Sequence, residues 1–231
     1  MAKSYDDDSF IPAVAGGALD LLPGGSLVSV FGERGAKLVL QEWRRNRSLT
    51  LSLAIKQAGL SREDLEELLI EHPRVVPLLI RTLHAAGMTG QDKTLRLLAG
   101  FLGHALADVS SISDVETLIG AVQNLTEHHI KVLEIVSSSR SDYPQLTEVA
   151  GDRWTTGLVV SISSMRSELT LVGVQGLLAT GFLSDAGLDG GGATWGDLES
   201  GGTILKVTEL GRTVLNMLGE VAEANRPGPQ A

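Results

Sequence analysis

The chain has 231 residues, no cysteine and a formal net charge of −9, which excludes disulfide bonds, thiolate catalysis and metal sites with cysteine ligands. Both parts of the sequence are acidic, since residues 1–120 carry 12 basic and 15 acidic side chains and residues 121–231 carry 7 and 13. Neither part has the general positive charge of a protein that binds nucleic acid or an anionic membrane.

Residues 1–24 are predicted to form a mobile N-terminal segment. Three consecutive aspartates, residues 6–8, precede an apolar stretch over residues 10–31, whereas a secretion signal carries basic residues at that point. The apolar stretch contains Asp20, and an acidic side chain near the centre of a membrane span costs about 2.5–3.5 kcal/mol. We therefore expect a cytoplasmic protein without a transmembrane helix. Contact between residues 10–31 and a membrane surface is an alternative.

Residues 25–123 are predicted to form a helical bundle. Ser61 is an expected N-cap because acidic residues follow it in the first turn. Gly59 and Gly87 are expected to end helices, because glycine adopts the left-handed conformation of a helix end at little cost. The expected helices cover residues 26–47, 49–58, 61–72, 74–86, 89–107 and 113–123.

Residues 124–224 are predicted to form a winged-helix-like domain that begins with three helices. Thr126 is the expected N-cap of the first helix, whose apolar side chains recur at a spacing of three residues. The second helical stretch covers about residues 154–167. Thr170 is the expected cap of the third helix, and Gly181 is expected to stop that helix in the left-handed conformation.

Two predicted strands, at residues 182–183 and 203–207, follow the third helix and enclose a glycine-rich loop. Thr208 is the expected cap of a closing helix over residues 209–223. This order predicts a winged helix with a two-stranded wing. Residues 225–231 contain two prolines and are predicted to form a disordered tail. The expected fold class is mainly α, with an N-terminal helical bundle and a C-terminal winged-helix domain.

The third helix lacks the side chains with which winged helices bind DNA. A helix in the major groove needs Arg, Lys, Asn or Gln on its exposed face, and nearby basic residues to contact phosphates. Outside the expected core positions, residues 171–180 offer Val172, Gln175, small residues and no basic residue, and the loop at 185–202 carries four acids and no base. We therefore expect Val172 and Gln175 to contact protein rather than DNA.

Two further features are candidate contact sites. Trp195 lies among glycines and acids in the wing loop, where it is either an anchor for a protein partner or a residue that packs on its own hairpin. The only basic cluster comprises Lys37, Arg44, Arg45 and Arg47. It is either a contact for an anion or nucleic acid, or the solvated end of a helix, where the helix dipole favours cations.

Motifs for catalysis and metal binding are missing from the sequence. His128 and His129 are adjacent, so on a helix they point about 100° apart and are poorly placed to chelate one metal. Neither His-Glu-x-x-His nor the nucleophile patterns Gly-x-Ser-x-Gly and Ser-x-x-Lys occur. We expect no catalytic residues, no metal, no cofactor and no enzymatic activity.

The stretch from Leu125 to Leu133, Leu-Thr-Glu-His-His-Ile-Lys-Val-Leu, resembles a Leu-Thr/Ser-Pro-x-His-x-x-Val-Leu helix entry in a group of bacterial and phage proteins of unknown function. These proteins pair a helical N-terminal region with a C-terminal winged helix and are similar to the Abi-alpha (abortive infection) type. Glu127 stands where proline is frequent in that group. The resemblance covers about residues 25–222 and implies a role in phage–host conflict. The other segments that carry it are 75–86, 95–107, 179–183 and 205–211.

The function expected from the sequence is therefore that of a non-enzymatic protein-interaction module of bacterial, phage or prophage origin. A protein partner or self-association is expected, nucleic acid is disfavoured, and a membrane partner is not expected. Two alternatives remain at this point. One is a winged-helix DNA-binding regulator that uses the basic cluster, and the other is a protein that associates with a membrane surface through residues 10–31.

Overall fold

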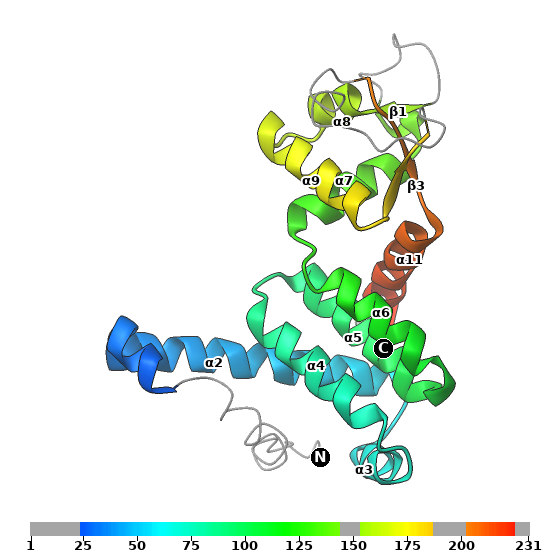
Figure 1. Ribbon diagram of the computed structural model, residues 1–231. Coiled ribbons are helices and arrows are strands. Elements are labelled where there is room, and N and C mark those ends of the chain that lie inside the picture. The colour runs from blue at the N-terminus through cyan, green and yellow to red at the C-terminus, as the bar shows by residue number, and fades with distance from the viewer. Residues whose placement is uncertain (1–23, 144–152, 187–201, 225–231) are drawn as a thin grey trace, which may run out of the picture. The chain divides into compact units, whose positions relative to one another are not determined.

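The computed structural model describes residues 24–143, 153–186 and 202–224. The chain divides into two compact units, residues 1–123 and 124–231, and each is described by itself (Figure 1). The expectations for residues 1–24 and 225–231 fall outside the described ranges, apart from Gly24. Among the described residues, no helix combines the length and the apolar character that crossing a membrane requires.

The first unit is helical, and α5 lies at its centre. This helix packs against α2, α4 and α6, and it is buried almost continuously from Thr94 to Leu106. These four helices therefore share one core. The elements are α2 (Gly24–Ala58), α3 (Arg62–Glu71), α4 (Val75–Met88), α5 (Asp92–Ala107), the short 3₁₀ turn η1 (Val109–Ser111) and α6 (Ile112–Val122).

Helix α2 is one continuous helix, so the prediction of two helices divided near residue 48 was wrong. Buried positions recur on one face at Trp43, Arg47, Thr50 and Ala54, which is helical spacing carried across the expected break. The end of the helix is as predicted. Gly59 has a φ of +69°, and the backbone N–H of the next residue donates to the carbonyl five residues back, at 3.2 Å.

The sequence had predicted that Gly87 ends a helix. That prediction was wrong, because Gly87 lies inside α4. A Cβ at this position would overlap the indole ring of Trp43 on α2. The absence of a side chain at Gly87 therefore makes room for a large aromatic residue at the contact between α2 and α4. The predicted cap at Ser61 is confirmed, because its hydroxyl accepts the N–H of Asp64 at 3.1 Å and the Asp64 carboxylate accepts the N–H of Ser61 at 2.8 Å.

The second unit combines helices with a small antiparallel sheet. Its strand order is β1-β3-β2, with Trp154 opposite Leu205 and Ser184 opposite Lys206. Helix α7 packs against α9 and against β3. The elements are α7 (Glu127–Ser137), the 3₁₀ turn η2 (Arg140–Asp142), β1 (Trp154–Thr155), α8 (Thr156–Ile162), α9 (Ser167–Ala179), β2 (Leu183–Asp185), β3 (Ile204–Val207) and α11 (Glu209–Ala224).

Strand β1 was missed by the sequence analysis, which had assigned Trp154 to a helix. A strand of two residues has no periodicity from which to recognise it. Its pairing with β3 holds it in place, and the Trp154 indole N–H donates to the Ser138 carbonyl at 3.1 Å. The described sheet therefore has three strands, where a two-stranded wing was expected.

The ends of the helices in this unit largely follow the sequence. Thr126 caps α7, because its hydroxyl accepts the His129 N–H. Gly181 has a φ of +77° directly after α9, as predicted. Thr208 accepts the Gly211 N–H through its hydroxyl at 3.1 Å and so caps α11. Thr170 differs, because it lies buried inside α9, which begins three residues earlier.

Candidate functional site

Helix α9 is the element on which the sequence placed a protein contact. Its inner side is held by the buried Val174 and Leu177. The Thr170 hydroxyl lies 2.9 Å from the Ser163 hydroxyl at the end of α8. Thr170 therefore ties α9 to the preceding helix, which explains why a residue typical of caps stands in the helix interior.

The two glycines of α9 face α7 and not solvent. Gly173 is buried, and a Cβ there would touch Val132 at 3.4 Å. A Cβ at Gly176 would overlap the imidazole of His129. Both belong to the small residues that were predicted to lie outside the core positions of this helix, and that prediction was wrong for them. They allow α7 and α9 to approach closely, so these glycines serve packing within the unit.

Beyond its first residue, Ser167, helix α9 has four exposed residues, Glu168, Val172, Gln175 and Ala179. Their spacing of four, three and four residues puts them on one face of the helix. Val172 is 52% exposed, which is considerable for an apolar side chain. We call these four residues the α9 stripe. It carries one acid and no base.

The basic cluster on α2 is not a single surface. Arg47, which was expected to contact an anion or nucleic acid, is only 5% exposed. Its guanidinium carbon lies 4.1 Å from the centre of the Trp43 ring, a cation–π contact. Its Nη1 atom is buried and has no hydrogen-bond partner among the described residues. Burial lowers the pKa of Arg47, because a charged group is less stable away from water.

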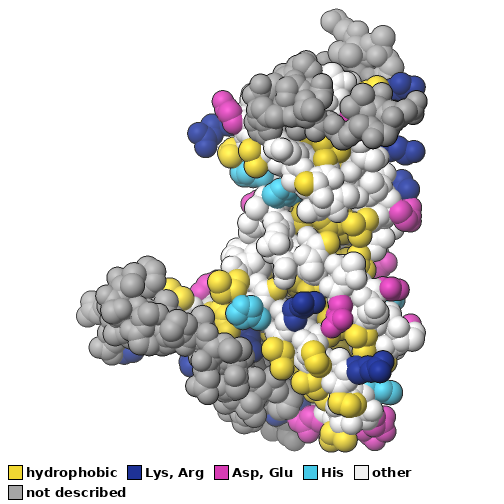
Figure 2. All heavy atoms as spheres, viewed as in Figure 1, with side chains coloured by type: hydrophobic (Ala, Val, Ile, Leu, Met, Phe, Trp, Pro, Cys, Tyr) yellow, Lys and Arg dark blue, Asp and Glu magenta, His cyan; other side chains and the backbone are white. Residues whose placement is uncertain are grey.

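The other three cations of the cluster are exposed but differ in their surroundings. Arg45 forms an ion pair with Glu42 at 3.2 Å, and Lys37 also takes part in an interaction. Arg44 points to a different side of the helix from Arg45, because consecutive residues are about 100° apart. On the face of the first unit shown in Figure 2, basic side chains stand apart and alternate with acidic and apolar ones.

A hollow of about 480 Å³ lies in the second unit, among the end of α7, strands β1 and β3, and the first turn of α11. Three of its lining residues are basic: Arg153, Lys206 and Arg212. None is acidic. We call it the cationic hollow. Its other lining residues are Val136, Ser137, Trp154, Ala186, Ile204, Leu205 and Val207.

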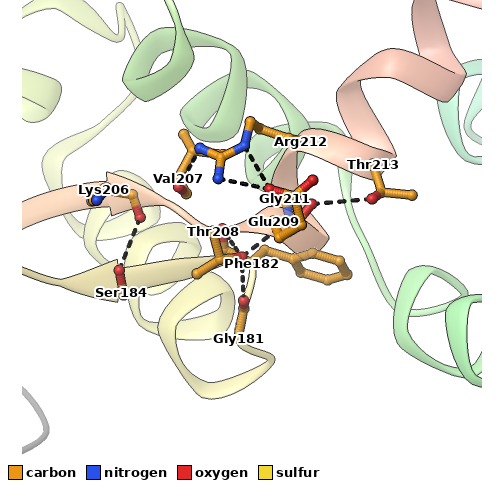
Figure 3. A network of polar contacts seen from close by, with 10 residues as sticks. All are labelled: Gly181, Phe182, Ser184, Lys206, Val207, Thr208, Glu209, Gly211, Arg212 and Thr213. Carbon is orange, nitrogen blue, oxygen red and sulfur yellow. Dashed lines mark hydrogen bonds and ion pairs between the residues drawn. The ribbon is translucent and has the colours of Figure 1, made fainter.

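One wall of the cationic hollow is held by a network of polar contacts (Figure 3). The Arg212 guanidinium donates to the Glu209 carboxylate at 2.8 and 3.0 Å and to the Val207 carbonyl at 3.3 Å. The backbone N–H of Thr208 donates to the Phe182 carbonyl at 3.1 Å. These contacts fix the first turn of α11 against β3 and the end of α9, so the position of Arg212 is set by the fold.

The fold alters the titration of His129. Its Nδ1 accepts the backbone N–H of Thr126 at 3.0 Å in the cap of α7, which requires that nitrogen to be unprotonated. Desolvation, and to a lesser extent the charge of His128, lower the pKa of His129. Among the described residues, no group of three or more metal-binding side chains occurs.

The sequence had not grouped the three cations of the hollow. Arg153 is far along the chain from Lys206 and Arg212, none of the three belongs to a basic run, and the pairing of β1 with β3 brings the segments of Arg153 and Lys206 together. Trp195, the other predicted anchor, lies outside the described residues. Comparisons of the chain with protein-family models, curated proteins and solved structures found no match.

Proposed function

We propose that the second unit is a winged-helix module, and that the protein acts through contacts with other proteins and not as an enzyme or a DNA reader. The order α7-β1-α8-α9-β2-β3-α11 supports the first part. A short strand follows the first helix and pairs with the last strand. The third helix ends in a left-handed glycine before the hairpin. These features occur together in winged helices.

The α9 stripe carries the second part of the proposal. In a winged helix this helix presents the surface that contacts a partner, and here that surface has an exposed Val172 and no cation. Burial of a valine side chain contributes about 1.5–3 kcal/mol, whereas Glu168 repels a phosphate. Half-buried Leu171 and Leu178 border the stripe, so a protein partner could extend the apolar contact on both sides.

The experiment is an affinity purification of the tagged chain from the cells that produce it, together with light scattering of the purified protein. Val172→Asp places a charge on the stripe and is expected to abolish partner capture or self-association. Ile70→Asp is the matched control, because Ile70 is 81% exposed in the first unit. That variant should retain whatever the unaltered chain binds.

Two results would overturn the proposal. One is a monomer that captures no protein, or a complex that Val172→Asp leaves intact. The other is binding to genomic DNA fragments that weakens with salt and is lost in Arg44→Ala/Arg45→Ala, because that pattern belongs to phosphate contacts. The second outcome would favour the DNA-binding regulator.

The resemblance to Abi-alpha type proteins supports placing this contact in phage–host conflict. Expression of the chain in a host strain is then expected to change the plating efficiency of at least one phage. Val172→Asp should remove the effect and Ile70→Asp should not. An unchanged plating efficiency across a broad phage panel would contradict a role in phage–host conflict. It would not bear on the proposed protein contact, which the affinity purification tests.

A further inference from the structure

The cationic hollow has features of a binding site that the α9 stripe lacks. Four apolar residues, Trp154, Leu205, Val207 and Val136, are among its lining residues, and because each is at most 8% exposed, each presents only a small apolar area to the hollow. Its volume of about 480 Å³ lies within the range of about 300–1,000 Å³ that ligand sites occupy. One side chain of a partner therefore fits the hollow and can contact these apolar residues.

The positive charge at the hollow is only partly compensated. Arg212 is paired with Glu209. Arg153 and Lys206 are exposed, and within the described ranges neither side chain has a hydrogen bond or an ion pair. No acidic residue lines the hollow in the part of the chain that the structure describes. Within the described ranges, two cations without an ion-pair partner thus border one cavity, although residues 121–231 as a whole carry 7 basic and 13 acidic side chains.

We propose that the cationic hollow binds an acidic peptide segment of a partner protein, in which carboxylates flank an aromatic or aliphatic side chain. The apolar side chain enters over Trp154, and the carboxylates pair with Arg153 and Lys206. An Arg–carboxylate pair adds directional hydrogen bonds to the charge. The inference names a partner class for the protein-interaction role proposed above and rests on that role.

Nucleic acid fits this site less well than a peptide does. A phosphate backbone needs a track of several cations along its path, and here the cations are confined to one cavity. The excess of acids in residues 121–231 repels a polyanion that extends beyond the hollow. A short peptide segment presents its few charges at the cavity alone, and its apolar side chain contacts apolar lining residues that a phosphate backbone leaves uncovered.

The test is a fluorescence anisotropy titration of the full chain with a labelled peptide in which Asp and Glu surround one Phe. Arg153→Gln/Lys206→Gln removes the two uncompensated charges and leaves Arg212 with its structural contacts. The matched control is Lys131→Gln/Arg166→Gln, which removes two positive charges of the same unit that do not line the hollow.

The peptide should bind the unaltered chain and the Lys131/Arg166 variant with similar affinity, and the Arg153/Lys206 variant about tenfold more weakly or worse. A peptide with Ser in place of Phe, and one with Asn and Gln in place of the acids, should each bind more weakly. The charge-reversed Arg153→Glu/Lys206→Glu should instead prefer a peptide with Lys around the Phe, which shows that the charges act directly.

Several outcomes would overturn the proposal. They are no peptide binding, equal weakening in both double variants, and binding of a single-stranded oligonucleotide of the same charge at least as tightly as the peptide. The hollow shares no residue with the α9 stripe, so Val172→Asp should leave the peptide affinity unchanged. Loss of peptide binding in that variant also contradicts the proposal, whereas a failed Val172 test with intact peptide binding rejects the α9 contact alone.

Discussion

The two units of the chain place their basic residues in opposite ways. In the first unit, the only basic run in the sequence lies on α2, and Arg47 turns inward onto Trp43. In the second unit, Arg153 and Lys206 come from distant segments, stay exposed and border one cavity. One member of the basic run, Arg47, serves helix packing, while two basic residues that are far apart in the sequence border a candidate binding site.

The difference shows that basic residues form one charged surface only where the fold puts them on the same face, whatever their spacing in the sequence. On a helix, consecutive residues point about 100° apart, so a run such as Arg44, Arg45 and Arg47 is spread around the helix. In a sheet, paired strands bring distant segments within about 5 Å. If this comparison is right, substitutions at Arg47 and at Arg153 should act on different properties, stability in one case and binding in the other.

The largest expected effect is at the packing site of the first unit. Trp43→Ala removes the ring on which Arg47 lies and leaves a void against Gly87, so the free energy of unfolding should fall by about 3–5 kcal/mol. Chemical denaturation followed by circular dichroism measures it. Trp43→Phe is the control, because it retains an aromatic face and removes a smaller volume together with an indole N–H without a partner, so its loss should be smaller. Equal losses in the two variants would contradict this role of the ring.

The second prediction concerns close packing within the second unit. A Cβ at Gly211 would overlap the Phe182 carbonyl oxygen and lie 2.8 Å from Val207, and a backbone group cannot move aside as a flexible side chain can. Gly211→Ala should therefore lower the free energy of unfolding by about 1–3 kcal/mol. Gly219 lies on the same helix with open space around it.

The matched variant Gly219→Ala should instead raise the free energy of unfolding by up to about 1 kcal/mol, because alanine favours a helix over glycine. Thermal unfolding of both variants beside the unaltered chain gives the two signs in one experiment. Opposite signs would support close packing at Gly211, in the first turn of α11, and open space at Gly219. Two changes of the same sign would contradict this difference.

The glycines and caps also show how far the sequence could predict the fold. Caps depend on a few neighbouring residues, so Ser61, Thr126, Gly59 and Gly181 were placed correctly. Gly87 was misjudged as a helix end, because its reason for being glycine is an indole that comes from α2. A long-range contact of this kind leaves no mark on the sequence around the residue.

The candidate site was less predictable than the fold. The absence of cations on the α9 stripe could be recognised from helical spacing alone, and Val172 and Gln175 are exposed as expected. The inward turn of Arg47 and the grouping of Arg153 with Lys206 depend on tertiary packing. A two-residue strand gives no periodic signal, so the pairing that creates the cationic hollow was not visible in the sequence.

The third prediction tests the opening comparison directly. Arg47→Met replaces a buried guanidinium that has an unpartnered Nη1 with an apolar side chain of similar length. It removes a desolvation cost and a cation–π contact of about 0.5–2 kcal/mol. The free energy of unfolding should be unchanged or higher by about 1 kcal/mol. Arg153→Met, at an exposed position, should change stability by less than about 0.5 kcal/mol but weaken binding of the acidic peptide.

Urea titrations of both variants, paired with the peptide titration, make this check. A loss above about 2 kcal/mol in Arg47→Met would mean that the guanidinium has a strong partner, and the first unit would then use its cation as an ionic anchor. Unchanged peptide affinity in Arg153→Met would also contradict the comparison, because Arg153 would then not contribute to peptide binding.

The smallest expected effect is the pH dependence that His129 gives the second unit, where it is a titratable group turned inward. The fold lowers its pKa, so the folded state binds a proton less readily than the unfolded state, whose ordinary value is about 6.5. The unfolded state therefore holds more protons as the pH falls below about 6.5, and stability decreases until the folded pKa is passed. Above about 6.5 both states are neutral at this site and the contribution is constant.

Unfolding free energies measured from pH 8 to pH 5 test this, with His129→Gln as the main variant. Glutamine at this third helical position can still accept the Thr126 N–H, as in other capping boxes, but does not titrate, so its stability should fall less on acidification. His128→Gln leaves the cap group in place and is the control that should keep most of the pH dependence. If His129→Gln and the unaltered chain lose the same stability on acidification, protonation of His129 does not cause that loss. The pH sensitivity would then belong to groups elsewhere in the chain.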